Sequence, residues 1–307
     1  MFEAVLNLFL AAIFLQAQAT NPADAVMPAN SLPLAQQKIE ARLPEKAIDS
    51  ESLGVRVSAK SFIVVEPETG AVLYEKNSQD CRPIASLTKL MTALVFLEHN
   101  PGWDKQYTMT ADDFRVGAKP ALMVGDVLTV RELFYTMLIS SANEAAVALA
   151  KSTGLTPEEF VGQMNLYAKL LAMDSSQFSE TTGLSVDNKA SAEDVIKLIK
   201  VAFSHSEIRK ALGFKSYNVS IINKNLSRHI NSTDMILKAE FGYRGDSYKL
   251  EAGKTGTLPS AGYCFASQVK DQNNRRLLIA VLGSSSTYDR FTDTKSLAYW
   301  VFNNFSW

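Results

Sequence analysis

The sequence predicts an α+β fold in which one antiparallel sheet is built from both ends of the chain and a helical subdomain is inserted in its middle. Residues 61–74 and 217–282 contain β-rich runs. The residues between them repeat apolar side chains with helical spacing. Two β-rich regions that enclose a helical block favour one discontinuous domain over two sequential ones, and we expect it to cover residues 56–307.

The first 19 residues are expected to be a secretory signal peptide outside the fold. Residues 4–15 read AVLNLFLAAIFL, which is too short to cross a bilayer, and Ala17-Gln18-Ala19 matches a cleavage pattern. The segment before this run carries Glu3 and no Lys or Arg, so a misassigned start, an uncleaved anchor and, less well supported, a buried N-terminal helix remain alternatives. Residues 20–55 are rich in Ala, Pro, Gln and Ser and are expected to be a linker or an N-terminal arm.

The first ordered elements are predicted to be a hairpin and then a helix. The runs Ser61–Val65 and Ala71–Tyr74 flank a Pro- and Gly-containing turn at 66–70, which is typical of a β-hairpin. The period then changes, because apolar residues at 87, 90, 91, 94 and 97 predict a helix over Ser86–Leu97.

Helix start signals mark the rest of the helical block. Residues 129–132 and 156–159 both match the capping box, in which the first and fourth residues bond each other's backbone N–H groups. Ser191 matches a helix cap, because Glu193 and Asp194 follow it in the first turn. The helices predicted from these signals and from an Ala-rich run are 130–139, 143–151, 157–173 and 192–203.

Strands return after residue 217, and the chain closes with a helix. The predicted strands are Tyr217–Ile222, Tyr248–Thr255, Tyr263–Val269 and Leu277–Leu282. The last predicted helix, Asp289–Phe302, has a dense apolar run that favours packing on the sheet.

Composition excludes several classes of function. Lys and Arg number 31 and Asp and Glu 32, so the net charge is −1 and the chain lacks the basic excess of a nucleic-acid-binding protein. Cys81 and Cys264 are too few for a disulfide scaffold or a four-thiolate zinc site. Cys264 lies in an apolar strand, which favours a buried thiol and makes a Cys81–Cys264 disulfide the minority alternative. The three histidines are scattered singly, so we predict neither a metal nor a cofactor.

The first of three short motifs is Ser86-Leu87-Thr88-Lys89, at the start of a predicted helix. Residues at i and i+3 lie on one helix face, which brings Ser86 and Lys89 together. A hydroxyl needs a neighbouring base to act as a nucleophile, and a lysine with a lowered pKa can be that base. The alternative is a capping serine and a solvated lysine, since a chain of this length holds roughly one S-x-x-K by composition alone.

The other two motifs contribute complementary polar groups. Ser141-Ala142-Asn143 lies at a junction of predicted helices, where Ser141 can relay a proton and Asn143 can orient Lys89 or a substrate amide. Both residues are also ordinary helix caps. Lys254-Thr255-Gly256-Thr257 lies in a predicted strand, where a lysine offers a cation to a substrate carboxylate, a threonine offers a hydroxyl and Gly256 lets a ligand approach the backbone.

The ordered set S-x-x-K, S-x-N and K-T-G is far more specific than any one motif. On these residues the chain resembles the low-molecular-weight penicillin-binding proteins, the serine D-alanyl-D-alanine carboxypeptidases and endopeptidases of the cell wall. The resemblance covers roughly residues 56–305 and includes Pro83-Ile84-Ala85, Phe178, Gly183-Leu184 and Ala261-Gly262-Tyr263-Cys264. It implies that the predicted α+β fold is of the β-lactamase/transpeptidase type.

The resemblance also implies an acyl-enzyme mechanism on peptidoglycan stem peptides that end in D-Ala, with β-lactams as covalent inhibitors. Ser86 would be the nucleophile and Lys89 would accept its proton. Ser141 would pass that proton to the leaving amine, held in place by Asn143.

The same resemblance assigns the K-T-G-T strand to substrate binding. Lys254 and Thr255 would bind the terminal carboxylate. The backbone N–H groups of Ser86 and Thr257 would bind the oxyanion that develops in the transition state. Some carboxypeptidases of the family place an arginine near the carboxylate, but residues 284–287 contain none. Arg290 is close to this position, and the alternative for it is an ordinary charge at the start of the last helix.

Two alternative functions are weighed against a D,D-peptidase. A β-lactamase would carry Glu-x-x-Asn to position the deacylating water, but no such pattern lies between residues 151 and 190, where Glu180 is followed by Thr181, Thr182 and Gly183. The middle motif is also Ser-Ala-Asn in place of Ser-Asp-Asn. A catalytically silent binder or sensor of cell-wall peptide or β-lactam is disfavoured because every expected catalytic side chain is present. The choice between carboxypeptidase and endopeptidase stays open.

The signal segment and the resemblance together predict an exported protein. We expect it in the periplasm or outside the cell, with loose membrane association left open and no integral membrane span in the mature chain. The expected partners are peptidoglycan stem peptides, with no nucleic acid.

Overall fold

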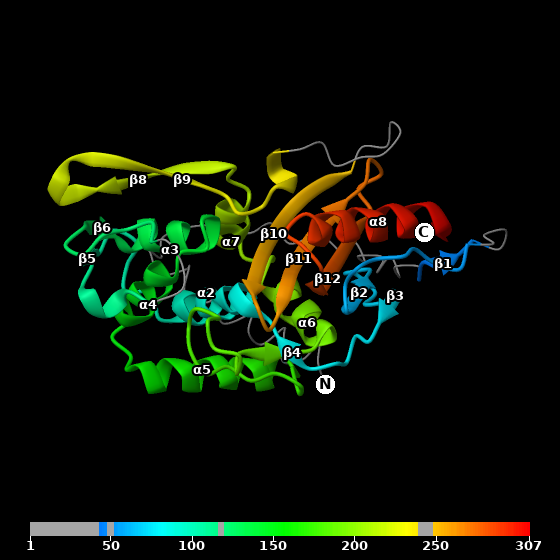
Figure 1. Ribbon diagram of the computed structural model, residues 1–307, viewed down its shortest axis with the longest axis horizontal. Helices are drawn as coiled ribbons and strands as arrows, with labels where there is room; N and C mark the ends of the chain where they lie inside the picture. Colours follow the sequence, from blue (N-terminus) through cyan, green and yellow to red (C-terminus); the bar gives the residue numbers. More distant parts are fainter. Residues whose placement is uncertain (1–42, 48–51, 116–119, 239–247) are drawn as a thin grey trace, which may run out of the picture. The chain divides into compact units, whose positions relative to one another are not determined.

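A five-stranded antiparallel sheet is the central element of the fold (Figure 1). Its strands lie in the order β10–β11–β12–β2–β3, so the two strands nearest the N-terminus join three strands near the C-terminus. The bounds are β2 Ser61–Val65, β3 Val72–Lys76, β10 Lys249–Leu258, β11 Gly262–Lys270 and β12 Arg276–Ser284. The predicted antiparallel sheet from both chain ends, and the hairpin that begins it, are thereby confirmed.

The computed structural model describes residues 43–47, 52–115, 120–238 and 248–307. The predicted signal peptide, residues 1–19, and most of the predicted arm, residues 20–55, lie outside these ranges. Within the arm, β1 (Glu45–Lys46) pairs with β13 (Phe305–Ser306) beside the end of the last helix.

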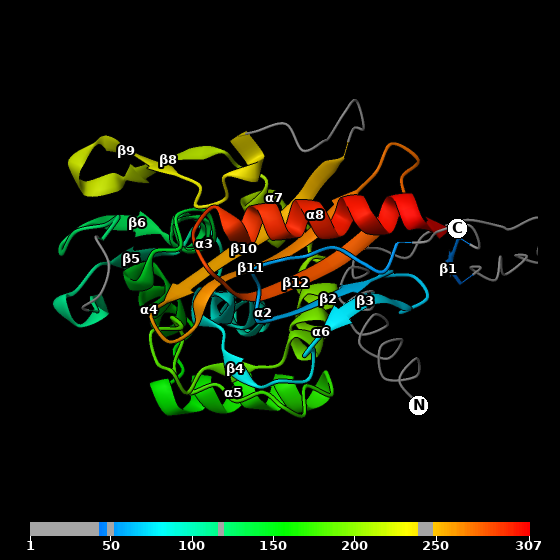
Figure 2. The same ribbon diagram turned by 45° about the vertical axis from the view of Figure 1, so that its right-hand side comes forward.

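The two faces of the sheet are covered by different helices. Alternate residues of a strand point to opposite faces, and Phe62 and Val64 join one apolar cluster whereas Ile63 and Val65 join the other. The first cluster includes side chains of α8 (Asp289–Asn304), which lies along the sheet in front of its strands (Figure 2). The second includes side chains of α6 (Ala192–Ala202) and of the inserted helical block. The predicted packing of the last helix on the sheet is confirmed.

The inserted block lies between β3 and β10 and surrounds one buried helix, α2 (Thr88–Glu98). A short 3-10 turn, η1 (Ala85–Leu87), leads into it. The other helices are α3 Val130–Ile139, α4 Asn143–Ser152, α5 Pro157–Leu170 and α7 Ser206–Leu212, with 3-10 turns η2 Ala111–Asp113, η3 Ile222–Lys224 and η4 Ile236–Lys238. Three short antiparallel pairs complete it: β4 Arg82–Pro83 with β7 Lys189–Ala190, β5 Gln106–Thr108 with β6 Val127–Thr129, and β8 Ser216–Ile221 with β9 Leu226–Asn231.

The helix starts follow the capping signals, with one difference. Thr156 and Ser191 accept bonds from the backbone N–H of Glu159 and Asp194, and the capping box at 156–159 is complete. At 129–132 only half of the box forms, because the Glu132 carboxylate accepts a hydrogen bond from the Tyr217 hydroxyl instead of the cap N–H. A tertiary contact has displaced the local one.

Candidate active site

The three sequence motifs meet where η1 and α2, the turn between α3 and α4, and strand β10 come together. Lys89 Nζ lies 3.1 Å from Ser86 Oγ and 2.7 Å from Asn143 Oδ1. Lys254 Nζ donates to Ser141 Oγ at 2.8 Å. The contexts predicted for the motifs, helix start, helix junction and strand, are confirmed, although Ser86 lies in the 3-10 turn that precedes the α-helix.

Lys89 has the surroundings of a base. Its side chain is fully buried, and burial lowers the pKa of Lys89 to about 7 against the opposing effects of Glu180 and Glu144. A neutral amine has two N–H donors, and Nζ has two close acceptors, the Asn143 side-chain oxygen and the Thr182 carbonyl oxygen at 2.6 Å. Its lone pair is then left for the Ser86 hydroxyl. This arrangement suits proton transfer from serine to lysine at neutral pH.

Two non-glycine residues at the site have left-handed backbone conformations. Ala85, which precedes the serine of the first motif, has φ 49°, and Ser141 has φ 61°. Such a conformation costs roughly 1–3 kcal/mol in a residue with a side chain, and it persists only where the surrounding structure enforces it. The surrounding structure therefore fixes the backbone at Ala85 and Ser141, and with it the directions of the Ser86 and Ser141 side chains.

Strand β10 carries the third motif along the edge of the sheet beside η1. Lys254 is buried, and burial together with the cations Lys89 and Arg290 holds the pKa of Lys254 well below its ordinary value. The Thr255 hydroxyl lies 2.6 Å from the hydroxyl of Thr233. Gly256 packs against η1 so closely that a Cβ there would lie 2.7 Å from the Ile84 carbonyl oxygen. Glycine is thus needed for packing of the two motifs as well as for access.

Arg290 lies in the site, so of its two interpretations the ordinary charge on the last helix is wrong. It is only 5% exposed, and its guanidinium donates to the Gly256 carbonyl oxygen at 3.2 Å and to the Thr257 hydroxyl at 2.9 Å. Among the described residues, every hydrogen-bond acceptor of Lys254 and Arg290 is a neutral oxygen. The buried Asp234 acts on both side chains through its charge, but it is hydrogen-bonded to neither among the described residues. Two buried basic side chains without a hydrogen-bonded carboxylate make a favourable place for an anion.

A clear signal for Arg290 was present in the sequence. The buried residues of α8 recur at helical spacing, and Arg290 begins that row; its members are Arg290, Thr294, Leu297, Ala298 and Val301. A charge on the buried face of a helix is rarely an ordinary surface charge.

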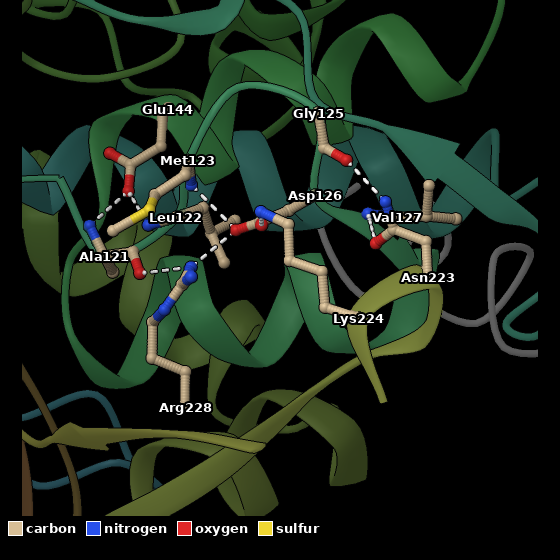
Figure 3. Close-up of polar contacts among 10 residues, drawn as sticks. All are labelled: Ala121, Leu122, Met123, Gly125, Asp126, Val127, Glu144, Asn223, Lys224 and Arg228. Atoms are coloured by element: carbon tan, nitrogen blue, oxygen red, sulfur yellow. Dashed lines mark hydrogen bonds and ion pairs between the residues drawn. The ribbon is translucent and has the colours of Figure 1, made fainter. Parts of the chain in front are cut away.

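The segment 120–127, which lies beside the Ser141-Ala142-Asn143 motif, was not predicted from the sequence to border the site. Glu144, the residue after Asn143, accepts from the backbone N–H of Ala121 and Leu122 at 2.6 and 3.1 Å (Figure 3). Asp126 is fully buried and is paired with Lys224 and Arg228 from the β8–β9 hairpin. The segment 120–127 is therefore anchored on one side by α4 and on the other by the hairpin. Neither Glu144 nor Asp126 belongs to a recognisable local sequence motif, so their anchoring of this segment is visible only in the folded chain.

The loop 179–188 comes close to the backbone that leads into Ser86. Gly183 has φ +85°, and a Cβ there would lie 2.0 Å from the Ala85 carbonyl oxygen. The loop 179–188 that contains it also delivers the Thr182 carbonyl oxygen to Lys89. The backbone path of both segments therefore depends on a glycine at 183.

Replacing Gly183 by alanine is expected to lower the free energy of unfolding by about 3 kcal/mol or more and to slow active-site acylation. Gly154→Ala is a matched control, because Gly154 has φ +87° but no atom within 4 Å of the added Cβ. The control should lose only about 1–2 kcal/mol, the cost of a left-handed alanine. Chemical denaturation of both variants measures the difference, and equal losses would contradict a steric role for Gly183.

Neither cysteine belongs to the three motifs, although Cys264 is the cross-strand partner of Gly256. Cys264 is buried in β11, as its apolar strand predicts, and Cys81 is exposed; both thiols are free. Within the described ranges no group of His, Cys, Asp and Glu side chains is arranged to hold a metal ion. None of the described helices combines the length and the apolar character that a membrane span requires.

Comparison with known proteins gives a consistent result. The family model for D-alanyl-D-alanine carboxypeptidase matches residues 46–286. A D-alanyl-D-alanine endopeptidase of Haemophilus influenzae is 31% identical over 242 residues, which cover 78% of this chain and 80% of the relative. A D-alanyl-D-alanine carboxypeptidase of Bacillus subtilis is 30% identical, and the match covers 80% of this chain but 63% of that longer protein.

Solved structures agree with these relatives. The Streptomyces K15 DD-transpeptidase superposes with a TM-score of 0.74 at 27% identity, covering 82% of this chain and all of that one. Penicillin-binding protein D2 from Listeria monocytogenes, solved in an ampicillin-bound form, superposes with a TM-score of 0.69 at 30% identity over 82% of this chain. The predicted fold type and the resemblance noted in the sequence are both confirmed. The chain belongs to the D-alanyl-D-alanine carboxypeptidase family and is a serine-type D,D-peptidase.

Proposed function

We propose that this D,D-peptidase cleaves peptidoglycan stem peptides at the bond after the penultimate D-Ala, through an acyl-enzyme on Ser86. The observation that carries the proposal is the contact of Lys89 Nζ with both Ser86 Oγ and Asn143 Oδ1 in a fully buried position. A buried amine beside a hydroxyl supplies the base that a serine nucleophile needs without a histidine.

In the proposed acylation step, Ser86 Oγ forms a bond to the carbonyl carbon while its proton moves to Lys89 Nζ. The carbonyl oxygen becomes an oxyanion, which the backbone N–H groups of Ser86 and Thr257 would stabilise. Collapse of this intermediate breaks the C–N bond, and Ser141 relays a proton to the leaving amine. Water then attacks the ester and regenerates the Ser86 hydroxyl.

The proposed binding site for the terminal carboxylate lies along β10. Lys254 on this strand and Arg290 beside it are buried and hydrogen-bond no carboxylate among the described residues, and Thr255 adds a hydroxyl. A bound carboxylate would favour the charged form of Lys254 and offset the burial that lowers its pKa. The groups that would bind the carboxylate therefore lie next to the reacting serine.

Replacing Lys254 by alanine is expected to reduce kcat/KM for a peptide ending in D-Ala-D-Ala by roughly 100-fold or more, because a charged partner of the carboxylate is lost. The same peptide with an amidated C-terminus should react slowly with both enzymes and show a much smaller ratio. Lys200→Met, at an exposed position of α6, is the control and should leave both rates unchanged. An equal loss on the two peptides would contradict carboxylate recognition by Lys254.

One experiment decides between release of a terminal residue and cleavage of a cross-link. Purified protein is incubated with a stem pentapeptide and, separately, with a cross-linked peptide dimer, and the products are identified by mass. Relatives named carboxypeptidase and relatives named endopeptidase are similarly close to this chain, so both substrates belong in the test. Absence of cleavage of either substrate by protein that still reacts with penicillin would overturn the proposed peptidase substrate.

We also propose that residues 1–19 direct export and are removed, and that residues 56–307 form the peptidase domain. An enzyme that acts on peptidoglycan works outside the cytoplasm, and the apolar run with its Ala17-Gln18-Ala19 sequence fits that requirement. Sequencing the N-terminus of the protein recovered from the cell envelope tests the cleavage; recovery of an intact Met1 would contradict it.

A further inference from the structure

Glu180 is a carboxylate close to the active site that takes no part in the proposed acylation steps. It belongs to the loop 179–188, in the region where a β-lactamase would carry a water-positioning glutamate. One oxygen of its carboxylate accepts from the backbone N–H of Gly183 at 2.6 Å and from the Asn188 amide at 2.5 Å. The other accepts from the N–H and the hydroxyl of Thr182, both at 2.6 Å. With both oxygens occupied by its own loop, Glu180 is poorly placed to activate a water molecule.

The turn that Glu180 organises is in direct contact with the catalytic centre. The Thr182 carbonyl oxygen accepts from Lys89 Nζ at 2.6 Å, and the Thr181 carbonyl oxygen accepts from the Thr92 hydroxyl on α2 at 2.7 Å. Gly183 lies against the Ala85 carbonyl group. Three consecutive residues of the turn therefore touch the elements that carry Ser86 and Lys89, and Glu180 bonds two of them.

The carboxylate also acts on Lys89 through its charge. The charged groups around Lys89 are Glu180 from this loop, Glu144 from α4 and Lys254 from β10. Burial lowers the pKa of Lys89, and the two carboxylates oppose this effect, with Glu180 the stronger. Glu144, like Glu180, accepts hydrogen bonds from the backbone of a loop, here from Ala121 and Leu122. Neither carboxylate is among the hydrogen-bond acceptors of Lys89.

We propose that Glu180 is a positioning residue for the reaction: its carboxylate shapes the loop that bonds Lys89 and adds a buried negative charge to the surroundings of that amine. This inference rests on the proposed role of Lys89 as the proton acceptor. It assigns a function to a glutamate that none of the three motifs contains.

The test is the pH dependence of acylation by a fluorescent penicillin in Glu180→Gln. Removing the negative charge disfavours protonated Lys89, so its pKa falls and the neutral amine is present at lower pH. The rise of the acylation rate with pH should therefore shift to lower pH by roughly half a unit or more. The maximal rate should also fall, because a glutamine nitrogen cannot accept the hydrogen bonds that a carboxylate oxygen accepts.

Glu66→Gln is a closely matched control. Glu66 is buried and uses its carboxylate in the same way, accepting from the N–H groups of Glu68 and Thr69 and from the Thr69 hydroxyl, but in the β2–β3 turn. It is not among the groups that act on Lys89. Its loss should lower stability without moving the pH profile of acylation.

Each outcome decides between specific alternatives. A fall in maximal rate of Glu180→Gln with an unshifted profile would overturn the electrostatic role and leave a structural one. Should Glu180→Gln fail to fold, Glu180→Asp keeps the charge with a shorter side chain; its profile should match the wild type, and a shift equal to half a unit toward low pH would overturn the proposal. A wild-type enzyme whose acylation shows no rise with pH near neutrality would instead contradict the base role of Lys89.

Discussion

Replacing Ser86 by alanine is expected to abolish covalent labelling by a fluorescent penicillin and to reduce peptidase activity by roughly 10⁴-fold or more. The hydroxyl is the atom that would form the acyl bond, and no other hydroxyl lies within hydrogen-bond distance of Lys89 Nζ among the described residues. Ser141, the next serine of the site, bonds Lys254 instead. Gel fluorescence after denaturation measures the adduct directly.

Ser140→Ala is the control for this substitution. Ser140 is adjacent in sequence to the second motif, but its hydroxyl donates to the Thr136 carbonyl oxygen within α3. It should label like the wild type. Continued labelling of Ser86→Ala would overturn the assignment of the nucleophile, and a wild-type adduct that disappears within a second would favour a β-lactamase.

The parts of the site that could be predicted from the sequence are those encoded by short-range spacing. Ser86 and Lys89 are three residues apart at a helix start, so local geometry alone brings their side chains to one face. That the three motifs meet could be predicted only from their occurrence together in this order, because no local rule brings Asn143 to within 2.7 Å of Lys89.

The remaining groups act through contacts that sequence spacing does not encode. Glu144 and Asp126 anchor a segment through backbone N–H groups and through a hairpin about 100 residues later in the chain. The predicted strand 217–222 forms, but it pairs with the unpredicted strand β9 outside the main sheet. Strand propensity is local, whereas the choice of partner is decided by tertiary packing. Arg290 differs from these, because the helical periodicity of α8 already placed it on the buried face.

Replacing Lys89 by methionine is expected to reduce acylation by roughly 10³-fold or more, because the serine loses its general base. Methionine has a similar length and fills the buried space. The same variant tests the lowered pKa through protein stability. Folded Lys89 releases its proton at about pH 7, whereas an unfolded lysine holds it to about pH 10.4.

Between these two pH values the unfolded state binds more protons, so the contribution of Lys89 to the free energy of unfolding rises with pH, by about 1.4 kcal/mol per unit. The contribution is fully present above the unfolded pKa and is lost as the pH falls to about 7. The difference in unfolding free energy between wild type and Lys89→Met should therefore grow in favour of the wild type from pH 7 to 10, measured by denaturant titration. Lys200→Met should show a constant difference, and a constant difference for Lys89→Met would mean that Lys89 is protonated at neutral pH and unsuited to be the base.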